Sequence, residues 1–143
     1  MERPSCGPER FLCFKLSKVM RRVQRYYESK LFCFGVTQAQ FYVLAAMWEQ
    51  DGIKFKDLAM ATNMDGATLT GILDRLERQD LLERRNDPDD RRSRLIFLKD
   101  KAKQIKNDMI GMALGLNREL ESQFPPDEFR TFLKVLDQLS NQG

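Results

Sequence analysis

Apolar residues recur at three- and four-residue spacing in the first part of the chain, which is the pattern of amphipathic helices. The first stripe runs from Leu12 to Tyr27, with lysines and arginines on the other faces, and predicts a helix of about 20 residues. Thr37 and Gln40 have the T-x-x-Q spacing of a capping box and predict the start of a second helix. That helix is expected to end near the Asp51–Gly52 pair.

Two closely spaced helices are predicted next. The segment KFKDLAMATN indicates a short helix that ends around Asn63. Asp65 is a candidate N-cap for the following helix, because an aspartate side chain accepts hydrogen bonds from the first free N–H groups. Two short helices joined by a tight turn are typical of a helix-turn-helix, whose second helix enters the DNA major groove. The apolar stripe of that second helix consists of Leu69, Ile72, Leu73 and Leu76.

A β-hairpin with a charged tip is predicted after this motif. The runs LLERR and RSRLIFL lie on either side of the turn-forming residues Asn86 to Asp89. A long helix follows, marked by apolar residues from Ile105 to Leu120 and closed by Pro125–Pro126, and a final helix carries a stripe from Phe129 to Leu139. The predicted fold class is therefore mainly α with a small β-hairpin wing, a winged helix-turn-helix with long helices added.

The composition fits one compact domain and excludes several classes of site. The 143 residues are 42% hydrophobic and 31% charged, and the net charge is only +3, so any affinity for nucleic acid must come from local clusters of lysine and arginine. The absence of histidine excludes catalytic triads and zinc sites that need an imidazole. Cys6, Cys13 and Cys33 lack a metal-binding spacing, so no metal or cofactor is expected. The cysteine usage and the lack of a long apolar run favour a cytoplasmic protein without a membrane span.

The outer face of the second helix of the motif has the chemistry for contacting DNA. Small residues at its start allow a close approach to base edges, where threonine offers a hydroxyl or a methyl group. Arginines one to two turns later are placed for phosphates. Any exposed helix carries residues of these types, so the helix alone leaves a purely structural interpretation open. The predicted contacts are Ala67, Thr68 and Thr70 to bases, and Arg75, Arg78 and Lys54 or Lys56 to phosphates.

The hairpin tip adds a more specific signal. Arg91, Arg92 and Arg94 are placed to reach a minor groove or flanking phosphates, where the potential is strongly negative. Asp89 and Asp90 would oppose this unless they have another task. Because a carboxylate can hold a guanidinium by a bidentate contact, we predict that Asp90 orients Arg92 or its neighbour.

The run ATLTGILDRLERQDLLERRNDPDDRRSRLIFL resembles the recognition helix and wing of the MarR family of bacterial transcription regulators. The D-x-R wing signature of that family falls on Asp90 and Arg92, and the recognition helix on about Gly66 to Gln79. The resemblance implies a homodimeric, sequence-specific DNA-binding protein, expected to be a repressor on a pseudo-palindromic operator. It also implies release from DNA by a small ligand or an oxidant.

The resemblance covers nearly the whole chain, because the flanking helices match the order of elements in the family. Two departures affect loop geometry. Asp80 stands where the family often has glycine, and Leu98–Lys99 with Lys101–Ala102 stand where it often has Leu-Thr-x-x-Gly. The implied division of the single domain 1–143 is a DNA-binding lobe at 37–100, a connecting helix at 101–123, and dimerisation helices at 10–30 and 124–142.

A ligand-sensing role is implied by the same resemblance, because family members respond to small phenolic or drug-like molecules. Tyr26, Tyr27, Phe41 and Trp48 are candidates to line the cleft that would hold such a molecule. Aromatic residues at helical spacing are more often simply core, which is the alternative for Phe41 and Trp48.

An oxidant-sensing role is the other possibility. Cys13, early in the first helix, resembles the reactive cysteine of the peroxide-sensing OhrR branch, and Tyr27 matches one of its supporting tyrosines. Ser17 and Gln38 stand where two other tyrosines are expected, so a small buried apolar cysteine is the favoured alternative. Cys13 and Tyr27 would lie roughly 20 Å apart on one helix, so any contact between them must cross the dimer.

Two functions from other classes compete with the regulator. A winged-helix module that binds an acidic protein partner would use the same wing arginines. A thiol peroxidase using Cys13 would have no histidine base. Steep salt dependence with a sequence-dependent offset on duplex DNA separates the regulator from the protein-binding module, and measurable turnover is what the peroxidase would require.

Overall fold

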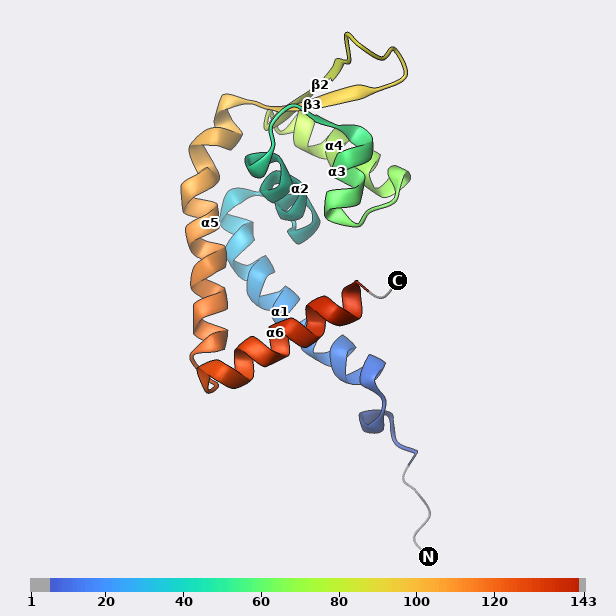
Figure 1. The fold of residues 1–143 in the computed structure, drawn as a ribbon. Coiled ribbons are helices and arrows are strands. Elements are labelled where there is room, and N and C mark those ends of the chain that lie inside the picture. Colours follow the sequence, from blue (N-terminus) through green and yellow to red (C-terminus); the bar gives the residue numbers. More distant parts are fainter. Residues whose placement is uncertain (1–5, 142–143) are drawn as a thin grey trace, which may run out of the picture. The chain divides into compact units, whose positions relative to one another are not determined.

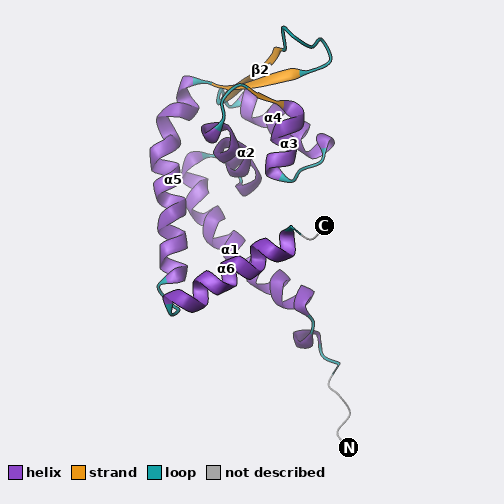
Figure 2. Cartoon of the chain, in the orientation of Figure 1, coloured by secondary structure: helices purple, strands orange, loops and turns teal. Residues whose placement is uncertain are grey.

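The computed structural model describes residues 6–141, which form mostly helices and one small sheet (Figures 1 and 2). The predicted fold class is confirmed. Pro4 of the N-terminal tail and Gln142 of the predicted last helix lie outside the described residues. The elements are η1 (Pro8–Arg10), α1 (Leu12–Leu31), η2 (Phe32–Phe34), α2 (Gln38–Glu49), β1 (Ile53–Lys54), α3 (Phe55–Thr62), α4 (Gly66–Arg78), β2 (Leu82–Asn86), β3 (Arg94–Leu98), α5 (Asp100–Glu121) and α6 (Pro126–Ser140).

The chain divides after Met109 into two compact units, and the first contains the helix-turn-helix and the sheet. Its core is formed by apolar side chains of α2, α3, α4 and the strands. The stripe predicted for α4 is confirmed, since Leu69, Leu73 and Leu76 are fully buried and Ile72 nearly so. The fully buried side chains of the other elements include Val43, Leu44, Met47, Leu58, Leu82 and Ile96.

The helix starts follow the predicted capping residues. The Thr37 hydroxyl accepts the N–H of Gln40, and the Gln40 side chain accepts the N–H of Thr37, which completes the capping box at the start of α2. Asp65 caps α4 by accepting the N–H of Thr68 at 2.7 Å. The turn before α2 uses Gly35 at φ 67°, a left-handed conformation that favours glycine.

Two helix ends place a non-glycine residue in the left-handed region. Asn63 ends α3 at φ 53°, and Asp80 follows α4 at φ 61°. After α4, the Leu81 N–H donates to the Leu76 carbonyl and the Asp80 N–H donates to the Glu77 carbonyl, each at 3.0 Å. This is the Schellman arrangement, which satisfies the last carbonyls of the helix.

The sheet has three antiparallel strands in the order β1-β3-β2. Strand β1 was not predicted, and it pairs Ile53 with Ile96 of β3. The Asp51 carboxylate joins the start of β1 to the end of β3 by accepting the N–H of Gly52 at 3.1 Å and the N–H of Leu98 at 2.8 Å. Gly52 has φ 69°, and a Cβ there would lie 2.9 Å from the Phe97 ring. A larger residue would therefore have an unfavourable backbone conformation and would also clash with Phe97.

The predicted hairpin is confirmed, but its turn is longer than predicted. Asn86 belongs to β2 and pairs with Arg94, the first residue of β3. The loop therefore runs from Asp87 to Ser93 rather than from Asn86 to Asp89, and the Asp87 N–H closes it by donating to the Ser93 carbonyl at 3.2 Å. Figure 1 shows this loop projecting from the lobe formed by α2, α3 and α4.

Helices α1 and α6 both expose apolar side chains to solvent. Among residues 6–141, no single helix is long and apolar enough to cross a membrane; only α1 with η2 and α2, which meet at a bend of 72°, pass that test as a pair. The exposed apolar residues at the N-cap and in the first half of α1 are Phe11, Leu12, Phe14, Leu16, Val19 and Met20, and those on α6 are Phe132, Leu133, Val135 and Leu139.

Candidate nucleic-acid interface

The outer face of α4 is exposed to solvent along most of its length. Burial of the apolar stripe turns Ala67, Thr68 and Thr70 outward, and all three are exposed. A Cβ added at Gly71 would have no other atom within 4 Å, so the surface there is open. The start of α4 can therefore approach another molecule closely, as the sequence predicted.

The hydroxyls of both threonines are already used within the helix. Thr68 donates its hydroxyl hydrogen to the Asp65 carboxylate at 3.0 Å, and Thr70 donates to the Gly66 carbonyl at 2.8 Å. The N–H and hydroxyl of Thr68 together lower the pKa of the Asp65 carboxyl. Because their hydroxyl hydrogens are used, the two exposed threonines have methyl groups and hydroxyl lone pairs left for another molecule, which suits a thymine methyl or a base donor.

Arg75 and Arg78 lie on the exposed face in the second half of α4. The Arg78 Nε donates to the Asp74 carbonyl at 3.3 Å, which leaves its terminal nitrogens for another partner. Neither guanidinium forms an ion pair with a carboxylate of the described residues. Both side chains are therefore available to phosphates.

Lys56 extends the same surface onto α3. An open hollow of about 610 Å³ separates α3 from the start of α4. Its lining includes Lys56 and Met60 from α3, the N-cap Asp65, and Gly66, the first residue of α4. Lys54, the residue before α3, is exposed as well. The structure therefore brings Lys56 beside the N-terminal end of α4, as a helix-turn-helix requires.

The wing loop is folded by aspartate side chains that accept backbone N–H groups. The Asp87 carboxylate, which is nearly buried, accepts the N–H of Asp89 at 2.9 Å. The Asp90 carboxylate accepts the N–H of Arg92 at 2.9 Å. The prediction that Asp90 holds an arginine side chain is therefore wrong in its detail, because Asp90 fixes the backbone of Arg92 and not its guanidinium.

The five arginines of the stretch from Arg84 to Arg94 fall into two groups. Arg84 and Arg85 form ion pairs at the base of the wing. The remaining three are exposed and have no carboxylate within ion-pair distance among residues 6–141; two lie in the loop and one at the start of β3, namely Arg91, Arg92 and Arg94. The projecting end of the wing thus carries the unpaired cations.

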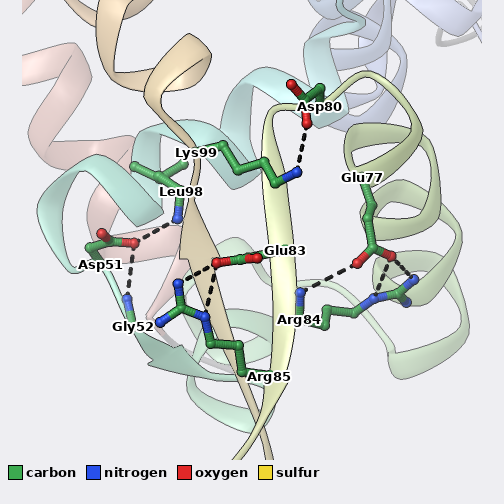
Figure 3. A network of polar contacts seen from close by, with 9 residues as sticks. All are labelled: Asp51, Gly52, Glu77, Asp80, Glu83, Arg84, Arg85, Leu98 and Lys99. Carbon is green, nitrogen blue, oxygen red and sulfur yellow. Dashed lines mark hydrogen bonds and ion pairs between the residues drawn. The ribbon is translucent and has the colours of Figure 1, made fainter.

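Arg84 was not predicted to have a role, and it joins the wing to α4 (Figure 3). Its guanidinium lies 2.6 Å from the Asp74 carboxylate and 2.5 Å from the Glu77 carboxylate. The hydrogen bond from Arg84 lowers the pKa of Glu77, and the same bond raises the pKa of Arg84. The spacing of Asp74 and Glu77, three residues apart on one helix, was the available signal, but the sequence does not show which strand residue faces them.

Arg85 occupies the other face of β2 at the base of the wing. Its Nε donates to the Glu83 carboxylate at 2.9 Å, and its guanidinium carbon lies 4.1 Å from the centre of the Phe97 ring. Alternation along the strand explains the split between neighbouring arginines, because successive side chains of a strand point to opposite faces. Arg85 therefore contacts both β2 and β3 on one face of the sheet.

Two residues that depart from the family pattern, Asp80 and Lys99, form an ion pair with each other. Asp80 occupies the left-handed position where glycine is common, and its carboxylate lies 2.6 Å from the Lys99 Nζ. The hydrogen bond from Lys99 lowers the pKa of Asp80 and raises that of Lys99. The turn after α4 thus keeps its geometry without glycine.

The aromatic residues proposed to line a ligand cleft pack against one another. The Phe41 ring centre lies 6.4 Å from that of Tyr27 and 6.5 Å from that of Trp48, and Phe41 is buried. Trp48 Nε1 donates to the Ala102 carbonyl at 3.2 Å. Burial raises the pKa of Tyr27, as does the nearby Tyr42. The core alternative therefore fits Phe41, whereas Trp48, Tyr26 and Tyr27 are only half-buried.

Cys13 is exposed in the second position of α1. Within the single chain Cys13 is therefore not buried. Tyr27 lies on the same straight helix, about 20 Å away at 1.5 Å per residue, so the two side chains do not meet within one chain.

Comparison with known proteins identifies relatives of this chain. Residues 36–93 match the model of the MarR family. The chain is 33% identical over 99 residues to the HTH-type transcriptional regulator MgrA of Staphylococcus aureus, covering 68% of this chain and 67% of that protein. It is 32% identical over 114 residues to the organic hydroperoxide resistance transcriptional regulator of Bacillus subtilis, covering 78% of each.

A solved structure of reduced AbfR bound to DNA is similar in fold, with 29% identity and a TM-score of 0.73 over 90% of this chain and 87% of that one. The relatives are transcription regulators and not enzymes, which excludes the peroxidase alternative. The chain belongs to the MarR family of winged helix-turn-helix, DNA-binding transcription regulators.

Proposed function

We propose that the protein is a homodimeric repressor that binds a pseudo-palindromic operator. In each half-site α4 lies in the major groove, and the wing reaches the adjacent minor groove. The observation that carries this proposal is the division of the wing arginines, since Arg84 and Arg85 are held by carboxylates while the outer arginines are not. The proposed wing contacts to DNA are Arg91, Arg92 and Arg94.

The proposed DNA contacts of the helix-turn-helix follow from which side chains are exposed and which hydroxyl groups already donate a hydrogen bond. Base reading uses Ala67 and the methyl groups of Thr68 and Thr70, whose hydroxyl hydrogens bond within the helix. Phosphates are bound by exposed cations on either side of that segment, because such contacts orient a protein on DNA without reading sequence. These cations are Lys54, Lys56, Arg75 and Arg78.

The homodimer is supported by the apolar side chains on α1 and α6. Val19 of α1 is 54% exposed and Leu139 of α6 is 48% exposed, within rows of further exposed apolar residues. Many exposed apolar side chains along one helix mark a protein interface. A second copy is the partner proposed, because a two-fold dimer supplies two recognition helices for two half-sites about one helical turn apart.

Release from the operator is proposed to follow binding of a small ligand or oxidation. The 32% identity to a regulator named for organic hydroperoxide resistance supports the oxidant, with Cys13 as the candidate thiol. The dimer is treated with a mild organic hydroperoxide and its operator affinity is followed. A loss of affinity in the wild type that Cys13→Ser abolishes supports the thiol, and equal behaviour of the two proteins rejects it.

The main test is selection of duplexes from a random-sequence pool by the full chain, followed by a salt titration. Enrichment of a pseudo-palindrome is expected, with affinity that falls steeply as salt rises. Enrichment of no sequence would reject the regulator. Failure to bind duplex DNA at low salt would favour the rival, a winged-helix module for an acidic protein.

A further inference from the structure

Three side-chain hydrogen bonds form a closed ring at the C-terminal end of α4. The Thr37 N–H donates to the Gln40 Oε1 at 2.9 Å, and the Gln40 Nε2 donates to the Gln79 Oε1 at 3.2 Å. The Gln79 Nε2 then donates to the Gly35 carbonyl at 2.6 Å. Because Gly35 and Thr37 are separated by a single residue, the ring ties the end of α4 to the segment between α1 and α2.

The direction of every bond in this ring is fixed by the capping box. The Gln40 Oε1 is occupied by the Thr37 N–H, so the Gln40 amide must present its Nε2 to Gln79. The Gln79 amide must in turn present its oxygen to Gln40 and its nitrogen to Gly35. Gln40 is only 4% exposed, so water cannot readily replace its partner.

Gln79 also anchors the first turn of α5. Its backbone carbonyl accepts a hydrogen bond from the Lys101 Nζ at 2.9 Å. One residue at the C-cap of α4 thus contacts the segment before α2, the buried side of α2 and the start of α5. Such a junction sets the orientation of the helix that ends there.

We propose that Gln79 is a positioning residue for DNA reading, which sets the angle at which the N-terminal half of α4 reaches the bases. This inference rests on the proposed use of α4 as the recognition helix. The helix is about 20 Å long at 1.5 Å per residue, so a tilt of about 5° at Gln79 moves Thr68 by more than about 1 Å. Bidentate or methyl contacts to base edges do not tolerate such a shift, whereas long arginine and lysine side chains still reach phosphates.

The test compares Gln79→Met with the wild type on two duplexes, the one that the wild type enriches from a random pool and a scrambled one. Methionine keeps the length of the side chain and removes both amide bonds. We expect the ratio of the two affinities to fall about 3- to 10-fold while the salt slope stays unchanged. Gln79→Glu keeps the acceptor for Gln40 but cannot donate to Gly35, and it is expected to lose discrimination as well.

Thr37→Val is the matched control, because it removes the other half of the capping box and leaves the ring intact. The Thr37 hydroxyl accepts only the Gln40 backbone N–H at 3.2 Å, and the ring uses the Thr37 backbone. This variant is expected to lower the melting temperature and to keep the affinity ratio. All variants are compared at a temperature at which circular dichroism shows them folded.

Separate outcomes reject the inference and the proposed function. An unchanged affinity ratio in both Gln79 variants, or an equal loss in Thr37→Val, overturns the positioning role while the regulator stands. A wild type that enriches no sequence overturns the proposed function, and the positioning role with it.

Discussion

Arginines of one short stretch have opposite roles because their neighbours differ. Arg84 faces α4 and neutralises two carboxylates of that helix, whereas Arg92 lies in a loop in which Asp87 and Asp90 bind backbone N–H groups. A guanidinium that already holds two carboxylates has little left for a phosphate. The residue type therefore identifies candidates, and only the surrounding contacts decide which of them reach DNA.

Arg92→Ala is predicted to weaken operator binding by about 1 to 3 kcal/mol at matched salt. The physical reason is the loss of a cation from the negative potential of the minor groove, with little change in the fold, because Arg92 is exposed and its side chain has no ion pair within residues 6–141. The measurement is fluorescence anisotropy on the selected duplex.

Lys103→Ala serves as the matched control for Arg92→Ala, because Lys103 is an exposed cation on α5 outside the motif. It removes one positive charge and is expected to change the affinity by much less. Equal effects of the two substitutions would mean that only net charge counts, and the wing assignment would then be withdrawn.

At the scale of elements, the wing and the recognition helix behave as one unit because Arg84 joins them. Arg84→Met is predicted to lower the free energy of unfolding by about 1 kcal/mol, since all three partners are partly exposed and solvent screens the pairs. It should also weaken operator binding, because Asp74 and Glu77 become unpaired negative charges on the helix that faces DNA. Denaturant titration and anisotropy measure the two effects.

Arg84→Lys separates charge from geometry in the same experiment. Lysine restores the positive charge but lacks the planar fork that contacts both carboxylates, so values between those of wild type and Arg84→Met are expected. If Arg84→Met binds the operator as tightly as the wild type, the clamp has no part in DNA binding.

The sequence predicted the elements whose signals are local. Thr37 with Gln40 and Asp65 marked helix starts, and the α4 stripe identified its buried face, because capping and helical periodicity depend on residues a few positions apart. Strand β1 was missed because two residues carry no periodicity. The wing loop was placed too early because Asn86 suits a turn and yet pairs with Arg94 in the sheet.

Within the candidate site, the exposed residues were predictable and their partners were not. Thr68, Arg75 and Arg92 could be assigned to the surface from the apolar stripe and the hairpin pattern. The contacts of Arg84 with Asp74 and of Asp80 with Lys99 join separate elements, so they depend on how those elements pack. No spacing in a single sequence reports such a pair.

At the scale of the whole molecule, stability is predicted to fall in acid. Hydrogen bonds from Thr68, Arg84 and Lys99 lower the pKa values of Asp65, Glu77 and Asp80, respectively. A carboxyl whose pKa is lower in the folded state stabilises the fold above its unfolded value, near about 4, and this stabilisation is lost as the pH falls through the folded value. Denaturant midpoints between pH 7 and pH 3 should therefore decrease below about pH 4.

Glu77→Gln identifies one source of that acid sensitivity. The amide cannot be ionised, so this variant should be less stable than the wild type at neutral pH and should lose less stability in acid. Parallel curves for the two proteins would show that the bond between Glu77 and Arg84 contributes nothing to the pH dependence.

Dimerisation is predicted to depend on apolar side chains that a single chain leaves in solvent. Val19→Lys on α1 and Leu139→Lys on α6 should each shift the protein from dimer to monomer, because a buried lysine would be unpaired in the interface. Both residues are about half exposed in the monomer, so the monomer should stay folded. Arg21→Gln, on the opposite, charged side of α1, should stay dimeric in analytical ultracentrifugation. Monomeric variants lose the second recognition helix. Their binding to the full operator should therefore be about 100-fold weaker, and half-site binding should be nearly unchanged. Monomeric variants that bind the full operator like the wild type would contradict the proposal that DNA is read by a dimer.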